Sequence, residues 1–515
     1  MKNGLGRFKV GERSLTHAFD GFAKMTSFDV INATTALFSS QFIATHFYND
    51  SLRTRTVAPY ITLGAKAPRM GSLEKVRAIS NGIDNTNVNI YSVASQRDDS
   101  AEFLAVSDFW HSYKVDPRTC STLEKIDPPL PVARFLGGLV PLPSTAHPVR
   151  ELGKSSRIGF VIYLNPIPGM NSQIHVIRIH SAQRRDVIAT FDVAQASYMH
   201  SLAVSGNFAV VMADPLFINT VKVVRDVVPL DALEWVPSQP TRLLIVDLNT
   251  LETHEASVAP RVHMHHINSR DEHGLLTIDY VAYHDVNFLQ SMTLKNLKHK
   301  RNRNKIQPKS RIVRYNIDVR AGVARQVALP GEGSVANALD FPTINEQFRH
   351  KPYCFAYGMV LMADGKNLEN TLLAKKDLCS GRDLFWQREN EFASEAIFVP
   401  DPALTDEDSG VLLTLVLNGT SGKSYLAVID ARNMLTLNQL QLPDFVPFTL
   451  HGEFLPREVE WRNGTEKPDE ARPKNDSHES AVVPSKGNQR IFEAFFVGVT
   501  VIWIRCHSII FQNFT

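Results

Sequence analysis

The sequence contains little cysteine and no long apolar run. Its 515 residues include only four cysteines, none of them in a C-x-x-C pair: Cys120, Cys354, Cys379 and Cys506. Such spacing argues against a disulfide framework or a zinc ribbon, and it favours a reducing compartment. No stretch reaches the roughly 18 apolar residues that a membrane-spanning helix needs.

A strong charge of one sign is also missing, because the formal net charge is only +2. The protein therefore has no long-range electrostatic field that would attract nucleic acid, and we predict no nucleic-acid partner. The N-terminal sequence shows no apolar core of a secretory signal, which favours a cytoplasmic protein. A plastid location stays open if the sequence lacks an upstream segment.

Short strand-like runs are abundant. Segments rich in Val, Ile, Leu and Tyr end near Asp, Asn, Gly or Pro, for example RIGFVIYL, RLLIVDL, LLTIDYVAY and YLAVIDA. Only residues 30–47 and 217–235 suggest amphipathic helices. Many short strands in one long chain indicate a sandwich, a barrel or a propeller, and periodicity alone does not decide among them.

Two regions differ from the rest in composition. Residues 295–311 carry eight Lys or Arg and no acid, so they form either a contact with an anionic surface such as membrane headgroups or a solvated loop. Residues 457–490 are polar and predict a disordered linker. The folded domain is therefore expected at 1–456. A short apolar tail at 491–515 is an interfacial anchor, a buried strand or a segment without a defined role.

Four of the eighteen histidines lie at the ends of strand-like segments: His147, His200, His265 and His451. Neutral imidazole is a good ligand for iron, copper or zinc. These residues are spread over about 300 positions, so only tertiary structure could bring them together, and their spacing alone is not a metal motif. Neighbouring strand residues point to opposite faces, so at most one of His265 and His266 reaches a common centre.

The segments around these histidines resemble the carotenoid cleavage oxygenases. The similar motifs are STAHP, SYMHSLAVSGN, HHIN and FTLHGEF, together with FDG at Phe19–Gly21, and the resemblance extends from about Gly4 to Pro456. It implies a seven-bladed β-propeller with a cap of loops and short helices. It also implies one iron(II) on the propeller axis, held by the four histidines, with coordination positions left for dioxygen. The family pattern H-x-x-N selects His265, with Asn268, over His266.

The resemblance further implies three acids that accept the outer N–H groups of the ligand imidazoles: Asp108, Asp340 and Glu395. Family members usually have Glu at all three positions. Two of these acids are Asp here, one methylene shorter, so we expect a bridging water or a backbone shift at their contacts. Loss of such partners lowers metal affinity, so this departure puts metal binding in question.

The activity implied by the family is cleavage of a conjugated C=C bond of a carotenoid or apocarotenoid by dioxygen, giving two carbonyl products. A retinoid-type isomerase and a stilbene-cleaving enzyme are alternatives. The lack of a PDPCK-like segment favours cleavage over isomerisation.

A catalytically degenerate lipid-binding propeller is a third alternative. Three features keep this alternative open: the two shortened acids, the C-terminal tail and the N-terminal sequence. The N-terminal sequence resembles the middle of the family's first blade, as if the first strand were missing. Residues 216–235 resemble a membrane-facing segment of the family, and a helix packed over the propeller is the other interpretation.

Overall fold

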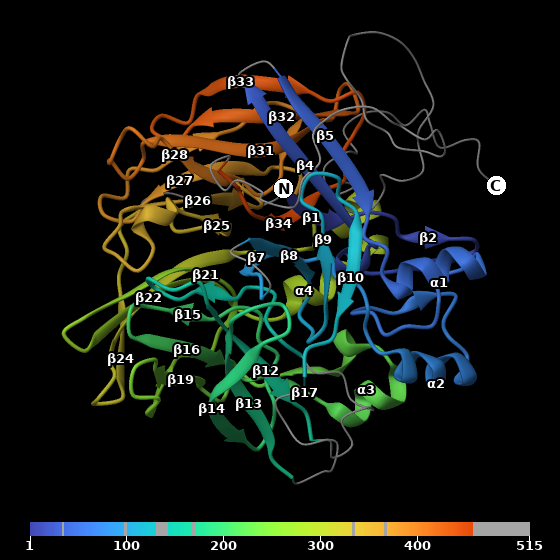
Figure 1. Ribbon diagram of the computed structural model, residues 1–515, viewed down its shortest axis with the longest axis horizontal. Coiled ribbons are helices and arrows are strands. Elements are labelled where there is room, and N and C mark those ends of the chain that lie inside the picture. Colours follow the sequence, from blue (N-terminus) through green and yellow to red (C-terminus); the bar gives the residue numbers. More distant parts are fainter. Residues whose placement is uncertain are drawn as a thin grey trace.

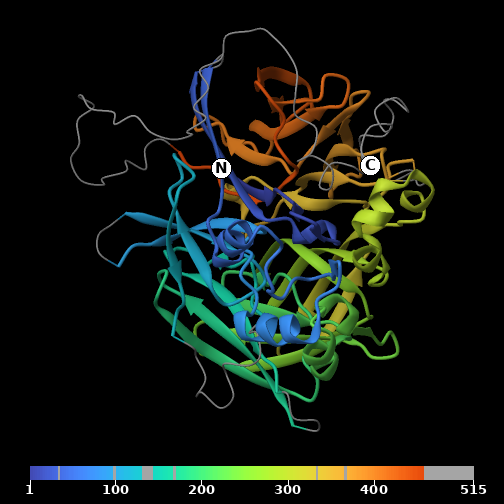
Figure 2. The same cartoon turned by 90° about the vertical axis from the view of Figure 1, so that its right-hand side faces the viewer.

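The computed structural model describes residues 1–32, 35–96, 100–129, 143–165, 170–331, 335–364 and 368–456. The linker expected at 457–490 and the tail expected at 491–515 lie outside the described residues. The described part consists mainly of antiparallel strands (Figure 1). Its short helices lie mostly on the side that faces the viewer in Figure 2.

Seven sheets of four or five strands follow one another in the described residues. The first combines strands from both ends of the described chain: β34 (Thr449–Gly452), β1 (Lys2–Leu5), β4 (Ala23–Asn32) and β5 (Thr35–Phe42). The second contains β7 (Asn89–Ala94), β8 (Ala101–Val106), β9 (Ser112–Val115) and β10 (Thr122–Ile126). The third contains β11 (Val149–Arg150), β12 (Arg157–Tyr163), β13 (Ser172–Ile179) and β14 (Arg185–Val193).

The remaining four sheets continue the series. The fourth contains β15 (Ala203–Val204), β16 (Phe208–Ala213), β19 (Thr241–Asp247) and β20 (Thr253–Val258). The fifth contains β21 (Val262–Glu272), β22 (Leu275–Tyr283), β23 (Ser310–Asp318) and β24 (Val323–Val327). The sixth contains β25 (Asp340–Thr343), β26 (Phe355–Val360), β27 (Leu372–Asp377) and β28 (Leu384–Trp386). The seventh contains β29 (Glu391–Ala393), β30 (Ile397–Pro400), β31 (Gly410–Asn418), β32 (Lys423–Asp430) and β33 (Thr436–Gln441).

Loops, short helices and two small sheets form the cap. The small sheets are β17 (Leu216–Ile218) with β18 (Leu233–Trp235), and β2 (Lys9–Val10) with β3 (Arg13–Leu15) and β6 (Lys66–Ala67). The α-helices are α1 (His46–Thr54), α2 (Ser72–Asn81), α3 (Thr220–Asp226), α4 (Asn287–Ser291), α5 (Leu294–Lys298) and α6 (Lys300–Arg303). Single 3-10 turns are η1 (Ala18–Asp20), η2 (Pro229–Ala232) and η3 (Glu346–Phe348). Among the described residues, none of the helices is long and apolar enough to cross a membrane.

Inner strands such as β12 and β16 are buried on both faces because their sheets pack between two neighbours. On β12, Phe160 and Ile162 join one apolar cluster, whereas Val161 between them joins another. This packing explains why the strands are continuous runs of Val, Ile, Leu and Phe instead of alternating with polar residues. A ring of such sheets is a β-propeller, which confirms the predicted fold class.

The ring is closed by pairing the first strand with the last. β1 lies between β34 and β4, with Lys2 opposite Gly452 and Gly4 opposite Thr449 (Figure 1). A Cβ atom at Gly4 would lie 2.7 Å from the carbonyl oxygen of Phe448, so only glycine fits this close approach. Lys2 also forms a buried ion pair with Glu395, which joins the first sheet to the seventh.

Of the two segments predicted as amphipathic helices, one is mostly strand in the structure and the other contains one short helix. The described residues of the range 30–47 form the end of β4, the strand β5 and the start of α1, so the helix prediction is wrong there. Pairing across the β4–β5 hairpin, with Phe28 opposite Phe38, outweighs the helical periodicity of this stretch. In residues 217–235 the only α-helix is the seven-residue α3, which Asn219 caps at its start and which ends where Val227 takes a left-handed conformation; β17, η2 and β18 occupy most of the rest.

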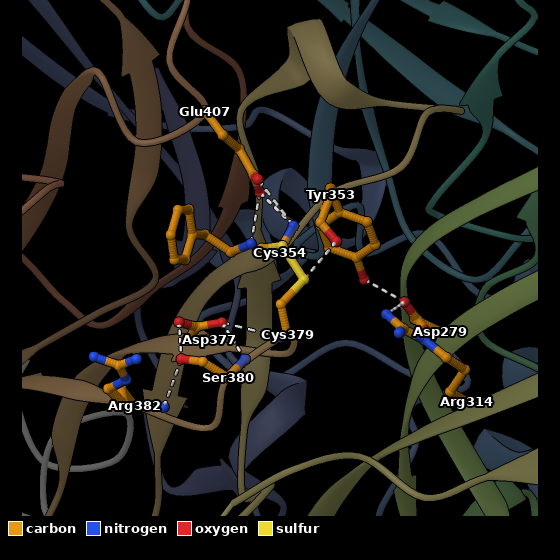
Figure 3. Close-up of a disulfide and its surroundings, with 10 residues drawn as sticks. Asp279, Arg314, Tyr353, Cys354, Asp377, Cys379, Ser380, Arg382 and Glu407 are labelled. Carbon is orange, nitrogen blue, oxygen red and sulfur yellow. Dashed lines mark hydrogen bonds and ion pairs between the residues drawn. A yellow bond between two sulfur atoms is a disulfide. The ribbon is translucent and has the colours of Figure 1, made fainter.

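One disulfide joins Cys354, just before β26, to Cys379, just after β27 (Figure 3). The Cα atoms of the two residues are 5.2 Å apart, while 25 positions separate them in the sequence. The backbone N–H of Cys354 also donates to the carboxylate of Glu407. The sequence spacing argued against a disulfide framework, but strand pairing brings these two cysteines together. The third described cysteine, Cys120, is free and buried.

We predict that the double substitution Cys354→Ser and Cys379→Ser lowers the free energy of unfolding by about 2–4 kcal/mol, because the cross-link restricts the unfolded chain. Denaturant unfolding with and without reductant measures this. Reductant should destabilise the unsubstituted protein and leave the double variant unchanged. If alkylation of the unfolded, non-reduced protein labels every cysteine, the disulfide does not exist in solution.

Candidate metal centre

The four histidines singled out in the sequence meet at one point. His147 lies just before β11, His200 just before β15, His265 within β21 and His451 within β34. One ring nitrogen of each lies within 4.8 Å of one ring nitrogen of each of the others. β11, β15, β21 and β34 belong to four different sheets, so the propeller brings together residues that are far apart in the sequence.

The facing nitrogens have the spacing expected of ligands to one cation. Nε2 of His147 lies 3.0 Å from Nε2 of His200, and Nε2 of His265 lies 3.2 Å from Nε2 of His451. Two nitrogens about 2.1 Å from one ion, at right angles to each other, would be about 3.0 Å apart. The donor set therefore fits a transition metal that prefers imidazole.

Each of the three acids lies directly against one ligand histidine. The Nδ1 atoms of His200, His265 and His451 donate to Asp108 at 2.9 Å, to Asp340 at 2.6 Å and to Glu395 at 2.7 Å, respectively. The alternative of a bridging water at the two aspartates is therefore wrong in this structure, because both contacts are direct. With Nδ1 protonated, each Nε2 presents a lone pair to the centre. Such facing lone pairs repel one another unless a cation lies between them.

The other histidines of the HMHH run face elsewhere. Nδ1 of His263 bonds Asp214 at 2.7 Å, and Nδ1 of His266 bonds the hydroxyl of Ser201 at 2.7 Å. β21 is irregular between His263 and Asn268, and only His265 of the run reaches the centre. The expectation that no more than one of His265 and His266 would do so agrees with this geometry.

Burial disfavours the protonated form of two of the four histidines, His147 and His451. It lowers the pKa of His147 well below its ordinary value, and the four neighbouring imidazoles lower it further. It also lowers the pKa of His451, against the opposing effect of Glu395. Burial disfavours the charge on Asp340, but hydrogen bonds from His265, Tyr283 and the Phe341 amide still hold its pKa below the ordinary value. Neutral His147 and His451 and an ionised Asp340 are the forms that metal binding requires.

A cavity under the cap reaches the histidines. His200, His265 and His451 are part of its lining, and most of the other lining side chains are apolar, among them Ile61, Leu63, Met264, Phe288, Phe341 and Leu450. Asp20 of the FDG segment also lines it, and its carboxylate accepts the N–H groups of Leu63 and Gly64. An apolar ligand bound there would lie beside the imidazole cluster.

The comparisons with known proteins agree with this architecture. Residues 1–456 match the family model described as retinal pigment epithelial membrane protein. The chain belongs to this family, the carotenoid cleavage oxygenases. The structure is also similar to cobalt-substituted apocarotenoid oxygenase of Synechocystis, with a TM-score of 0.72 and 21% identity over 87% of this chain and 90% of that chain.

Curated relatives of the family have similar overall length. β,β-Carotene 15,15′-dioxygenase of Mus musculus is 24% identical over 92% of this chain and 89% of its own length. The mitochondrial carotenoid-cleaving dioxygenase of Macaca fascicularis is 25% identical over 88% and 89%. The carotenoid isomerooxygenase of Galleria mellonella is 24% identical over 89% and 91%.

Three residues behind the acids were not anticipated from the sequence. The hydroxyl of Tyr198 donates to Asp108 at 3.0 Å, the hydroxyl of Tyr283 donates to Asp340, and Nζ of Lys2 donates to Glu395. Tyr198 lies in the SYMHSLAVSGN motif, but only His200 was assigned a role there, and none of the family motifs contains Tyr283 or Lys2. Their positions follow only from the way that the strands pair.

We predict that Asp340→Asn raises the dissociation constant for a divalent metal about 10–100-fold, because His265 loses its charged partner. Chelator competition measures the constant. The matched control is Asp214→Asn, which removes the same type of carboxylate from His263, a buried histidine outside the cluster. Equal metal affinities for the two variants would contradict the role assigned to Asp340.

Proposed function

We propose that this chain is an iron(II) dioxygenase that cleaves a conjugated C=C bond of a carotenoid or apocarotenoid into two carbonyl products. The convergence of His147, His200, His265 and His451 beside an apolar cavity carries this proposal. Family membership and the relatives named as carotenoid-cleaving dioxygenases support the substrate class. Iron(II), when bound, would supply the redox chemistry that activates dioxygen.

The protein contributes orientation and exclusion of water. Asp108, Asp340 and Glu395 hold protons on the outer nitrogens of their histidines, so the inner nitrogens are free to bind the ion. The apolar cavity walls would bind a polyene through its hydrocarbon surface and bring one double bond beside the cluster. The same walls keep bulk water away from the reacting carbons.

The shortened acids no longer favour a degenerate propeller, because both aspartates contact their histidines directly. A retinoid-type isomerase and a stilbene-cleaving enzyme stay alternatives, since they would use the same cluster. We favour cleavage because the lining side chains are mostly hydrocarbon and fit a long polyene.

We predict about one iron per chain in the purified protein, loss of this iron in His200→Ala, and its retention in His254→Ala, a histidine on the outer strand β20. Iron-loaded protein incubated with carotenoids and apocarotenals should bleach the polyene absorbance and release aldehydes, with both atoms of labelled dioxygen in the products. Isomerised substrate without label would identify an isomerase. Bound iron without turnover of any polyene would contradict the proposal.

We also propose a peripheral contact with membranes, where such substrates are stored. The helices α2 and α3 expose four apolar side chains, and Nζ of Lys75 on α2 bonds the carbonyl of Arg225 on α3. The exposed side chains, with the exposed fraction of each, are Leu73 (67%), Val76 (63%), Val221 (57%) and Val224 (47%). Val223, on the buried side of α3, lines the cavity. An apolar surface on the outside of the cavity wall would let a lipid-soluble substrate enter from a bilayer.

The basic segment 295–311 supports the same contact. It forms α5, α6 and the loop that follows, and it carries a charge of +8 in a chain whose net charge is +2, so the rest of the chain is acidic. Arg303 is buried and paired with Glu369, whereas the other seven cations of the segment are exposed. Leu297 and Pro308 of the segment line the cavity. Exposed cations at the rim of an apolar cavity fit anionic lipid headgroups.

We predict that Val224→Glu lowers the partition coefficient onto vesicles about tenfold or more, since burying one valine contributes roughly 1.5–3 kcal/mol. Vesicle flotation measures binding, with and without anionic lipid and at two salt concentrations. Leu275→Glu is the matched control, because Leu275 is 46% exposed at the far tip of β22. Binding that is unaffected by Val224→Glu would instead support packing of α3 over the propeller as its sole role.

A further inference from the structure

A second layer of buried groups holds the acids of the metal centre in place. Asp340 divides its two carboxylate oxygens between two partners: Oδ1 accepts the His265 Nδ1–H at 2.6 Å, and Oδ2 accepts the hydroxyl of Tyr283. Glu395 is arranged in the same way, with His451 on Oε1 and Lys2 on Oε2. Each of these carboxylates is therefore fixed at both ends.

Asp108 has a different arrangement with the same type of partner. Its Oδ2 accepts both the His200 Nδ1–H at 2.9 Å and the hydroxyl of Tyr198 at 3.0 Å. Both tyrosines line the cavity, and Tyr283, which is 3% exposed, also stacks on Phe288. Both acids that are one methylene shorter than in the family pattern thus bond a tyrosine, and the acid of ordinary length bonds a lysine.

We propose that Tyr283 and Tyr198 are positioning residues, which hold the short aspartates against His265 and His200 and so set the affinity and geometry of the metal site. This inference rests on the proposed metal site and not on the proposed substrate. Without Tyr283, only Oδ1 of Asp340 would be held, by the His265 Nδ1–H and the Phe341 amide, and Oδ2 would lose its donor. The phenol fixes this second oxygen and so prevents rotation of the carboxylate. A phenol supplies that donor without adding charge, so the aspartate keeps its full negative charge for the imidazole.

The other possibility is that these tyrosines only fill space and satisfy their own hydroxyls. A buried tyrosine hydroxyl usually finds a partner, so a hydrogen bond alone does not distinguish the two roles. The protein contains a suitable comparison. Tyr353 is 7% exposed, and its hydroxyl bonds Asp279 at 2.6 Å, but Asp279 pairs with Arg314 and not with a ligand histidine (Figure 3).

The test compares Tyr283→Phe with Tyr353→Phe. Both variants lose a buried hydroxyl bonded to an aspartate, so both should lose thermal stability. Only Tyr283→Phe should weaken cobalt(II) binding, by about tenfold in chelator competition, and shift the visible absorption bands of the bound cobalt ion. Unchanged affinity and bands in Tyr283→Phe would overturn the proposal, whether or not the enzyme cleaves any polyene.

A double-substitution cycle separates positioning from packing. If Tyr283 acts through Asp340, then adding Tyr283→Phe to Asp340→Asn should change cobalt affinity by less than twofold, because the partner is already altered. If the fold-losses of cobalt affinity from the two single substitutions instead multiply in the double variant, Tyr283 does not act through Asp340. If Tyr283→Phe does not fold, Tyr198→Phe tests the positioning role at Asp108, through a side chain that faces the cavity. An unchanged spectrum of the cobalt ion bound to Tyr198→Phe would count against the proposal.

Discussion

Closure of the strand ring is the constraint on which the whole site depends. His451 lies on β34, and β34 is held by the antiparallel pairing with β1 from the other end of the described chain. The same strand β1 carries Lys2, which bonds the acid behind His451. One pairing therefore fixes a ligand, its acid partner and the group behind that acid. Glycine at position 4 permits the close approach that the pairing needs.

The parts of the site that have local motifs could be predicted from the sequence. STAHP, SYMHSLAVSGN, HHIN and FTLHGEF identify the four histidines by resemblance, and the structure brings all four together. The H-x-x-N pattern selected His265 over His266 through Asn268. In the structure, the side-chain amide of Asn268 donates to the backbone carbonyls of Phe348 and Lys351, and these bonds anchor β21 beside η3. Residues that fix backbone positions leave a pattern in sequence, and this is why such motifs are informative.

Features that arise only from long-range contact were missed. The disulfide joins positions that adjoin in space because β26 pairs with β27, and no spacing rule contains this information. Residues 30–47 have a helical pattern, but pairing within the first sheet converts most of them to strand. Tyr283 looked like an ordinary strand residue, since tyrosine is common in strands, and Tyr198 lies in the SYMHSLAVSGN motif, where only His200 was given a role. Their relation to the acids exists only after the sheets are assembled.

The charge of the site matches the ion that it is proposed to hold. Three carboxylates, those of Asp108, Asp340 and Glu395, surround the histidines, and one ammonium, that of Lys2, lies behind them. The sum is two negative charges, which a divalent cation neutralises. In an apolar cavity an unbalanced charge is costly, so a tyrosine is a better second partner for each aspartate than another lysine would be. A second ammonium there would leave the loaded site with a net positive charge against a hydrocarbon substrate.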